Sequence, residues 1–258
     1  PSFRANGLIA FNEKFNNKFV LIKGEGEGGL PDLDVRCLAI DKKNQLWIGT
    51  YRGLRILSSV DKFISETQLT ATAIIIEEEG LAQELFYEQS LLDIEVDGAN
   101  NKWVSIANAG VFLVSPNGQQ TLYHFTKSNS PLPSNNVIDI ESDGVNGEVF
   151  FATEKGLISF LGTNTNASDN LANVYVYPNP VRPNFNGTVK ISGLLDKANI
   201  KITDIEGNLV YETTSVGGTV EWDTTAFGKY KVASGVYMIF ISSEDALETK
   251  VKKVMIVR

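Results

Sequence analysis

The sequence predicts an all-β protein: an incomplete β-propeller of about three blades plus a partial one, followed by an immunoglobulin-like antiparallel β-sandwich. Two observations predict it. A glycine followed by an aliphatic residue recurs at positions 7, 53, 110 and 156, and repeats of roughly 40–50 residues built from short strands are typical of propeller blades. The repetition then stops, and the last third of the chain alternates apolar and polar residues between turn signals, as a small sandwich does.

Each later repeat contains the same succession of short elements. An apolar inner strand ends in Asp, a polar turn follows, and the next strand carries a large aromatic residue ahead of the Gly-aliphatic strand. The expected inner strands are 35–41, 90–97 and 137–143. The aromatic residues are Trp47, Trp103 and Phe150. Because they hold the same place in every repeat, we expect them to pack between blades rather than stack on a sugar.

The number of repeats is small for a propeller. The chain opens just before a Gly-Leu step, so we expect it to begin inside a blade, and the middle repeat carries an insertion around 74–89. Closed propellers have about four to eight blades, and an open array exposes strand edges. The sequence therefore predicts the C-terminal part of a larger protein, or blades that close across a partner chain.

Composition narrows the class of function. The formal net charge of −8 argues against nucleic acid as a partner and against charge-driven binding to anionic membranes. No stretch approaches the roughly 18 apolar residues of a membrane span. Lysines near the C-terminus alternate with apolar residues, which fits a half-exposed strand. Cys37 is the single cysteine and lies in an apolar run, so it is expected to be an inert buried thiol.

Residues for catalysis are sparse. His124 is the single histidine, which argues against His-rich metal sites and against a catalytic triad, and its neighbours place it on an outer strand. The glycine-rich segment 24–29 carries two glutamates and opens no helix, so it is expected to be a loop rather than a phosphate cradle. We therefore expect a protein that is not an enzyme and that has no cofactor.

The most suggestive polar feature is an acidic inner strand repeated in two adjacent blades. Alternation would bring Asp93, Glu95, Asp139 and Glu141 near one another, and clustered carboxylates could bind calcium, which prefers oxygen ligands. The other interpretation is that the final Asp of each strand starts a turn while the remaining carboxylates face water in the channel. The first repeat weakens the calcium interpretation, because it has Cys37 and an alanine at these places.

Three segments follow from these patterns. Residues 1–161 are expected to form propeller blades, 162–173 a polar linker, and 174–258 the sandwich. The third segment carries a series of short motifs in a fixed order. Their residues are Pro178, Asn179, Pro180, Gly207, Trp222, Asp223, Gly235 and Tyr237.

This motif series, with a final lysine-containing strand, resembles the C-terminal domain of proteins handled by the type IX (Por) secretion system of Bacteroidetes over about 85 residues. The repeats, which read Asp…Leu-Trp-Ile-Gly-Thr…Gly-Leu, resemble the two-component regulator propeller repeat over about 150 residues. Together they are similar to the PorZ-like surface components of the type IX attachment complex.

The resemblance implies a non-catalytic scaffold or interaction protein on the extracellular face of the outer membrane. It implies that the protein helps to anchor or process cargo, with other attachment-complex proteins, a sortase-like protease and a lipopolysaccharide as partners. In most proteins with this tail the domain is removed after export, whereas the PorZ kind keeps it, and both fates stay open here. Two alternatives remain: a ligand-sensing propeller of a two-component-type sensor, and the propeller of a secreted polysaccharide-active enzyme whose tail is an export signal.

Overall fold

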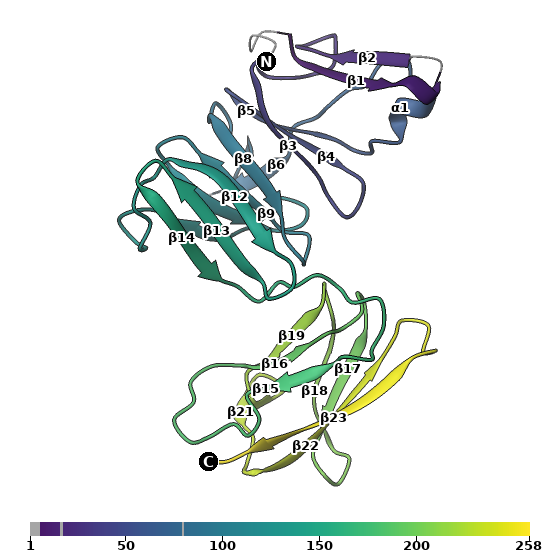
Figure 1. Cartoon of the computed structure of the whole chain (residues 1–258), viewed down its shortest axis with the longest axis vertical. Helices are drawn as coiled ribbons and strands as arrows, with labels where there is room; N and C mark the ends of the chain where they lie inside the picture. The colour runs from purple at the N-terminus through teal and green to yellow at the C-terminus, as the bar shows by residue number, and fades with distance from the viewer. Residues whose placement is uncertain (1–5, 16–17, 79) are drawn as a thin grey trace. The chain divides into compact units, whose positions relative to one another are not determined.

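The computed structural model describes residues 6–15, 18–78 and 80–258. Pro1, where the expected first blade segment begins, and Glu79 of the expected insertion lie outside them. The chain is all-β, as predicted, and divides into two compact units (Figure 1). The first unit contains residues 1–142 and 148–160, and the second contains 143–147 and 161–258.

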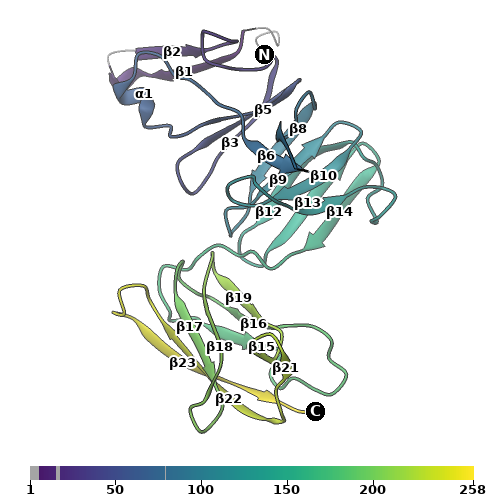
Figure 2. The same cartoon turned by 180° about the vertical axis from the view of Figure 1, so that it is seen from behind.

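The first unit is a succession of small antiparallel sheets, which Figure 2 shows from behind. Blade A is β3 (Val35–Ile40), β4 (Leu46–Thr50) and β5 (Gly53–Leu57). Blade B has four strands, β8 (Leu91–Val96), β9 (Lys102–Ile106), β10 (Gly110–Val114) and β11 (Thr121–Phe125). Blade C is β12 (Val137–Asp143), β13 (Glu148–Thr153) and β14 (Gly156–Leu161). The predicted order of inner, aromatic and Gly-aliphatic strands is therefore present in all three blades, and blade B adds an outer strand.

Shorter elements complete this unit. They are β1 (Leu8–Asn12), the 3₁₀ turn η1 (Glu13–Phe15), β2 (Lys18–Ile22), α1 (Lys62–Ser65), β6 (Ile75–Glu78) and β7 (Leu81–Glu84). The predicted insertion is the β6–β7 hairpin. Ile74 and Leu85 flank the hairpin and are buried between blades A and B, so the insertion contributes to the apolar core.

The blades stack face to face through apolar side chains. Trp47 and Leu54 of blade A pack with Leu91 and Val104 of blade B in one buried cluster. Trp103 of blade B packs with Phe151 of blade C in the next. The two tryptophans therefore lie between blades, as predicted. Phe150 of blade C lies on the opposite face from Phe151 and is only half-buried.

Turns after the inner strands are organised by the predicted aspartates. Asp41 Oδ1 accepts the backbone N–H groups of Lys43 and Gln45, each at 2.9 Å. Asp97 Oδ1 accepts those of Ala99 and Asn101 at 2.9 and 2.8 Å. A side chain that hydrogen-bonds to its own following turn replaces backbone pairing there, which explains why each inner strand ends in Asp.

The second unit is a sandwich of a three-stranded and a four-stranded antiparallel sheet. The first has the order β15 (Tyr175–Tyr177), β16 (Val189–Ser192) and β19 (Thr219–Trp222). The second has the order β18 (Leu209–Thr214), β17 (Asn199–Thr203), β22 (Gly235–Ser242) and β23 (Thr249–Ile256). A short pair is formed by β20 (Thr225–Ala226) and β21 (Tyr230–Lys231). The first strand, β15, is only three residues long, because the prolines that follow it have no N–H for the ladder.

Candidate functional site

The acidic side chains of β8 connect two blades. Asp93 Oδ2 accepts the backbone N–H of Ile140 in β12 at 2.7 Å. Glu95 Oε1 accepts the hydroxyl of Ser142 at 2.5 Å. A shift in the β8–β9 register between Leu91 and Asp93 marks a bulge, the kind of irregularity that re-aims side chains. Asp93 and Glu95 therefore lie half-buried against the next blade, whereas Asp139 and Glu141 are exposed.

The electrostatics of this acidic pair follow from that position. Burial raises the pKa of Asp93, and the charges of Asp139 and Glu141 add to the rise, while the hydrogen bond from Ile140 opposes it. Burial likewise raises the pKa of Glu95, with Glu141 adding to it and the Ser142 hydroxyl opposing it. Both groups therefore bind a proton more readily than a free carboxyl.

The predicted calcium site has no support in this geometry. Across residues 6–15, 18–78 and 80–258, no group of three or more His, Cys, Asp or Glu side chains is arranged to hold a metal ion. Asp93 and Glu95 are already engaged by blade C, and Asp139 and Glu141 are exposed on β12. Calcium binding stays a prediction that rests on the sequence pattern alone.

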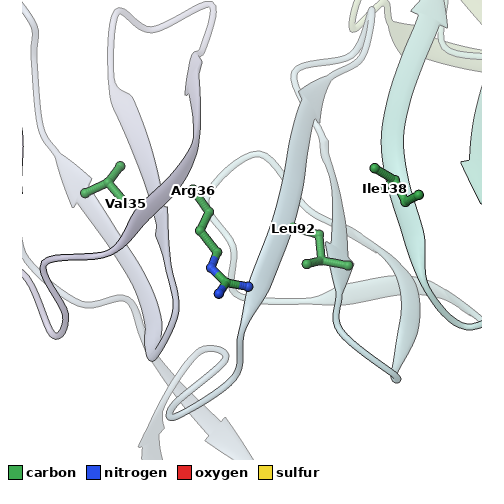
Figure 3. A pocket seen from close by; sticks show the side chains of 4 residues that line it. All are labelled: Val35, Arg36, Leu92 and Ile138. Carbon is green, nitrogen blue, oxygen red and sulfur yellow. The ribbon is translucent and has the colours of Figure 1, made fainter. Parts of the chain in front are cut away.

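A shallow hollow of about 260 Å³ lies along the inner strands of all three blades. Val35 and Arg36 of blade A, Leu92 of blade B and Ile138 of blade C line it (Figure 3). These positions were not among the site residues predicted from the sequence. The repeat could have identified them, because residues 36, 92 and 138 hold the same place in the three inner strands.

The arginine in this hollow is held in place by its neighbours. Nε and Nη2 of Arg36 donate to Asp34 Oδ2 at 3.2 and 3.1 Å, and Nη1 donates to Ser90 Oγ at 2.9 Å. Its guanidinium carbon also lies 4.7 Å from the centroid of the Tyr51 ring. The lining is otherwise aliphatic, so it offers apolar contact and one fixed positive charge, and none of its four residues is a nucleophile or general base.

A buried ion pair joins blades A and B. Lys102 Nζ donates to Asp41 Oδ2 at 2.8 Å, and both side chains are fully buried. The same ammonium donates to the carbonyls of Asn100 and Pro116 and lies 4.5 Å from the Trp47 ring centroid. A buried charge is tolerated where it is paired and hydrogen-bonded in this way.

The pair shifts the pKa of both side chains. Burial acts to raise the pKa of Asp41, but hydrogen bonds from Lys102 and the turn backbone outweigh burial and lower it. Burial lowers the pKa of Lys102, and Asp41 opposes that change. The pair is a structural connection between blades, because the Lys102 ammonium and the Asp41 carboxylate are occupied by each other and by neighbouring backbone groups.

The remaining chemically notable side chains are also structural. Cys37 is buried, and burial raises the pKa of its thiol to about 12, as expected for an inert cysteine. His124 lies on β11, stacked on Phe112 with ring centroids 3.8 Å apart, and its Nε2 is 2.8 Å from the Ala109 carbonyl oxygen.

At the entrance to the sandwich, the motif residue Asn179 bridges to the last strand. Its Nδ2 donates to the Lys253 carbonyl at 2.9 Å, and its Oδ1 accepts the Met255 N–H at 3.0 Å. Val181 then bridges to Ile256 in parallel. The peptide bonds before Pro178 and Pro180 are cis. Asn179 therefore attaches the entering chain to β23, and with it joins the two sheets.

Deeper in the sandwich, Trp222 and Tyr237 form its aromatic centre. Trp222 is fully buried, and its Nε1 donates to the Thr225 carbonyl at 2.9 Å. The Tyr237 hydroxyl donates to the Ala233 carbonyl at 3.0 Å. Asp223 Oδ1 accepts the Thr225 N–H at 3.0 Å. These contacts stabilise the domain, so these three motif residues serve its fold.

Two motif glycines lie at a turn and at the start of a strand. Gly207 adopts a φ of 92°, in the left-handed region that favours glycine, within the turn between β17 and β18. Asp204 organises that turn by accepting the N–H groups of Glu206 and Asn208, each at 2.9 Å. Gly235 is exposed at the start of β22. Both glycines serve chain geometry rather than binding.

The sandwich also presents an apolar surface that was not predicted from the sequence. Phe240 and Val251 are paired across β22 and β23, and Met255 lies farther along the same face. All three side chains are between 44% and 49% exposed. We call these three residues the sandwich patch. A signal existed, because β22 has large apolar residues at successive positions and is therefore apolar on both faces. Exposed apolar surface of this kind marks contact sites.

Known families match two parts of the chain. Residues 175–257 match the secretion system C-terminal sorting domain. Residues 29–52 match the two component regulator propeller. No curated protein matches the chain. Within the described residues, the helices are too short or too polar to cross a membrane.

The chain is similar to the solved structure of PorZ, described as an essential surface component of the type-IX secretion system of Porphyromonas gingivalis. The identity is 28%, the TM-score is 0.65, and the match covers 100% of this chain and 36% of PorZ. Extracellular domains of two hybrid two component systems from B. thetaiotaomicron match less well. Their identities are 11% and 13%, with TM-scores of 0.43 and 0.45, over 99% and 98% of this chain and 35% and 48% of theirs. The chain thus spans about a third of the length of PorZ.

These findings confirm the predicted resemblance and the predicted fold class. Propeller-type blades and a sorting domain lie in one chain, and that chain is similar to PorZ along its whole length. They support a role associated with type IX secretion and a location in the cell envelope or at the cell surface.

Proposed function

We propose that the protein is a non-catalytic scaffold on the extracellular face of the outer membrane, where it helps the type IX attachment machinery to anchor or process cargo. The observation that carries this proposal is the combination of propeller-type blades with a C-terminal sorting domain, similar to PorZ over all of this chain. PorZ is described as an essential bacterial surface component of the type-IX secretion system.

The local chemistry fits a scaffold. The buried Lys102–Asp41 pair and the acidic side chains of β8 are used to connect blades. The one thiol is buried with a raised pKa, and the one imidazole stacks on a phenylalanine. These side chains are therefore engaged in structure.

Contact with other proteins is the activity that the surface favours. The sandwich patch presents Phe240, Val251 and Met255 on one face of a rigid sheet. Large apolar side chains on rigid strands are suited to binding, because little conformational entropy is lost when they are covered. We assign the patch to a partner protein of the attachment machinery. The sortase-like protease is our first candidate, with lipopolysaccharide as the cargo anchor.

The test is complementation of a strain that lacks the gene. Wild-type protein should restore cargo attachment to the cell surface, measured by fractionating cargo between cells and medium. The variant Phe240→Asp, Val251→Asp should fail to restore it, because two charges would prevent burial of the patch. Thr249→Asp, on the same exposed face of β23, is the matched control and should restore attachment.

Each variant needs an independent check of folding. The charged patch variant must keep the thermal transition of the wild type, since its substitutions lie on the solvent face. Trp222→Ala, which opens a cavity in the sandwich, shows what a folding defect looks like. If the patch variant is folded and still restores cargo attachment, the sandwich patch is not the binding surface. Normal attachment in the deletion strain itself contradicts the proposed function.

A further inference from the structure

The last strand of the sandwich has one side that is an edge of its sheet. β23 ends the order β18-β17-β22-β23 (Figure 1). On the side away from β22, the Lys253 carbonyl accepts Asn179 Nδ2 at 2.9 Å and the Met255 N–H donates to Asn179 Oδ1 at 3.0 Å. The Met255 carbonyl accepts the Val181 N–H at 2.8 Å. The odd-numbered residues of β23 therefore direct their backbone groups outward.

The covered part of this edge stops at Lys253. The Lys253 N–H and both backbone groups of Val251 point outward as well, because the N–H and C=O of a residue in an antiparallel strand lie on one side of it. Among residues 80–258, no hydrogen bond is described for these three groups. Unpaired backbone groups on an edge strand are a template for pairing with an extended chain. The bridge between Val181 and Ile256 shows that this edge accepts such a chain.

A hollow of about 450 Å³ lies beside the residues that begin β23. Residues 170–172 form one wall, and the chain that leads into β23, including Glu248 and Lys250, forms the other. Glu248 Oε2 accepts the Leu171 N–H at 2.9 Å, and Lys250 Nζ donates to the Ala172 carbonyl at 3.4 Å. These contacts hold the first wall in place. We call the outward backbone of Val251 and Lys253, together with this hollow, the edge site.

The edge site is positively charged, although the chain as a whole has a formal net charge of −8. Lys250 and Lys252 lie on either side of Val251, and both are half-buried on the face of β23 that carries Val254 into the core. A lysine in such a place packs its aliphatic stem on apolar surface while its ammonium reaches water. In the part of the chain that the structure describes, neither ammonium has a carboxylate partner.

We infer that the edge site binds an extended segment of another protein, which pairs with β23 as an added strand and alternates acidic and apolar residues. An apolar residue opposite Val251 would share its exposed face, and the acidic residues on either side would face Lys250 and Lys252. Main-chain hydrogen bonds supply affinity in this mode of recognition, and the side chains supply specificity. The inference goes beyond the proposed function and does not require the partner to belong to type IX secretion.

A second copy of β23 is a poorer occupant. In an antiparallel pairing of two copies centred on Val251, the lysines of one copy would lie opposite those of the other, and like charges directly opposite destabilise a pair of strands. Lysines on edge strands discourage pairing of this kind. An acidic strand removes the repulsion. The same side chains therefore select against a second copy and in favour of an acidic partner.

The probe is the peptide acetyl-Thr-Val-Glu-Val-Glu-Val-Thr-amide, added to the full chain of 258 residues. The first measurement is hydrogen exchange of the Val251 and Lys253 amides, which should be fast in the free protein. Saturating peptide should slow both amides at least about tenfold, because exchange would then require the new hydrogen bonds to open. A peptide of the same composition, with its glutamates and valines in separate blocks, should leave the exchange unchanged.

Two variants separate backbone pairing from side-chain contact. Val251→Pro removes the outward N–H and no hydrogen bond to β22, so an edge strand tolerates it, and it should weaken binding of the fluorescein-labelled peptide at least about tenfold. Val251→Ala keeps the N–H and should weaken binding by at most about fivefold. Both variants should keep the thermal transition of the wild type.

A second pair of variants tests the charge. Lys250→Gln with Lys252→Gln should weaken binding about tenfold at low salt, because two attractions to the acidic residues are lost. Lys197→Gln with Lys201→Gln is the matched control. It removes the same charge from lysines that already pair with carboxylates in the sandwich, at 3.8 and 3.2 Å. The control should change the affinity by less than about twofold.

Several results would overturn the inference. Unchanged exchange at Val251 and Lys253 with saturating peptide would mean that no strand is added there. Equal affinities of Val251→Pro and Val251→Ala would exclude backbone pairing. Equal binding of the two peptides, or equal effects of the two lysine pairs, would reduce the interaction to general charge attraction. Cargo attachment is not the readout, so failure of the edge site and failure of the proposed function are separate outcomes.

Discussion

The two interfaces between blades use the same apolar positions but different polar connections. Between blades A and B, Lys102 reaches back to Asp41 in a fully buried ion pair. Between blades B and C, Asp93 and Glu95 reach forward to the backbone and a hydroxyl of β12. The difference shows that the residues shared by all repeats determine how the blades pack. The polar residues that differ between repeats determine how the stability of each interface responds to mutation and pH.

The largest expected effect is at the A–B interface. Asp41→Asn keeps a side chain that can accept hydrogen bonds in the turn but leaves Lys102 buried without its counter-charge. Removing one partner of a buried pair costs about 3–5 kcal/mol, so the free energy of unfolding of the first unit, measured in urea, should fall by that amount.

Two further variants control this measurement. Adding Lys102→Met to Asp41→Asn should recover most of the loss, because no unpaired charge remains. Asp143→Asn, at the equivalent turn position of blade C, should change little, since the Asp143 side chain accepts the Val145 N–H at 2.8 Å and an asparagine oxygen can do the same. Equal losses for Asp41→Asn and Asp143→Asn would contradict the role of the ion pair.

A second comparison uses the same residue on a covered and on an uncovered blade face. Leu54→Ala opens a cavity between blades A and B and should cost about 3 kcal/mol. Leu157→Ala, at the same repeat position in blade C, should stay within about 0.5 kcal/mol of the wild type. The urea midpoints of the two variants measure the contrast directly. Similar losses at both positions would show that the face of blade C is covered in solution.

The smallest expected effect is the pH response of the B–C interface. Burial raises the pKa of Glu95, so the native protein holds this proton more tightly than the unfolded chain does. Its contribution to stability is present at pH values below the unfolded pKa and is lost as the pH rises through the folded pKa. As the pH falls from neutral toward the unfolded pKa of a glutamate, the stability of the wild type relative to Glu95→Gln should therefore increase.

Asp41 should respond in the opposite direction. Its pKa is lowered by Lys102 and the turn backbone, so its contribution is present above the unfolded pKa and is lost as the pH falls through the folded pKa. Thermal unfolding of wild type, Glu95→Gln and Asp41→Asn over this range and down to pH 3 separates the two. The same sign for both carboxylates would contradict the assignment of the interfaces.

Much of the fold could be predicted, because it rests on local patterns. The Gly-aliphatic steps and the Asp-turn-aromatic succession identified the strands, and the shared position of Trp47 and Trp103 identified the packing between blades. The end of the repetition separated the blades from the sandwich. These features depend on residues within one repeat, where the spacing of side chains is set by the strand itself.

The polar connections could not be predicted in the same way. Lys102 and Asp41 are 61 positions apart, and their pairing depends on how one blade is placed on the next. The direction in which the Asp93 side chain points depends on the bulge after Leu91, and strict alternation of side chains along a strand does not predict a bulge. The sandwich patch was missed because an apolar residue on a strand has the same sequence pattern whether it faces the core or the solvent.

The central claim is that this chain works as a surface scaffold of type IX secretion. The most direct measurement is chemical crosslinking on intact cells, followed by purification of the tagged protein and mass spectrometry of what is bound. The account predicts that proteins of the type IX attachment machinery are recovered with the wild type and lost with Phe240→Asp, Val251→Asp. Recovery of the protein from the cell surface without any component of that machinery would contradict it.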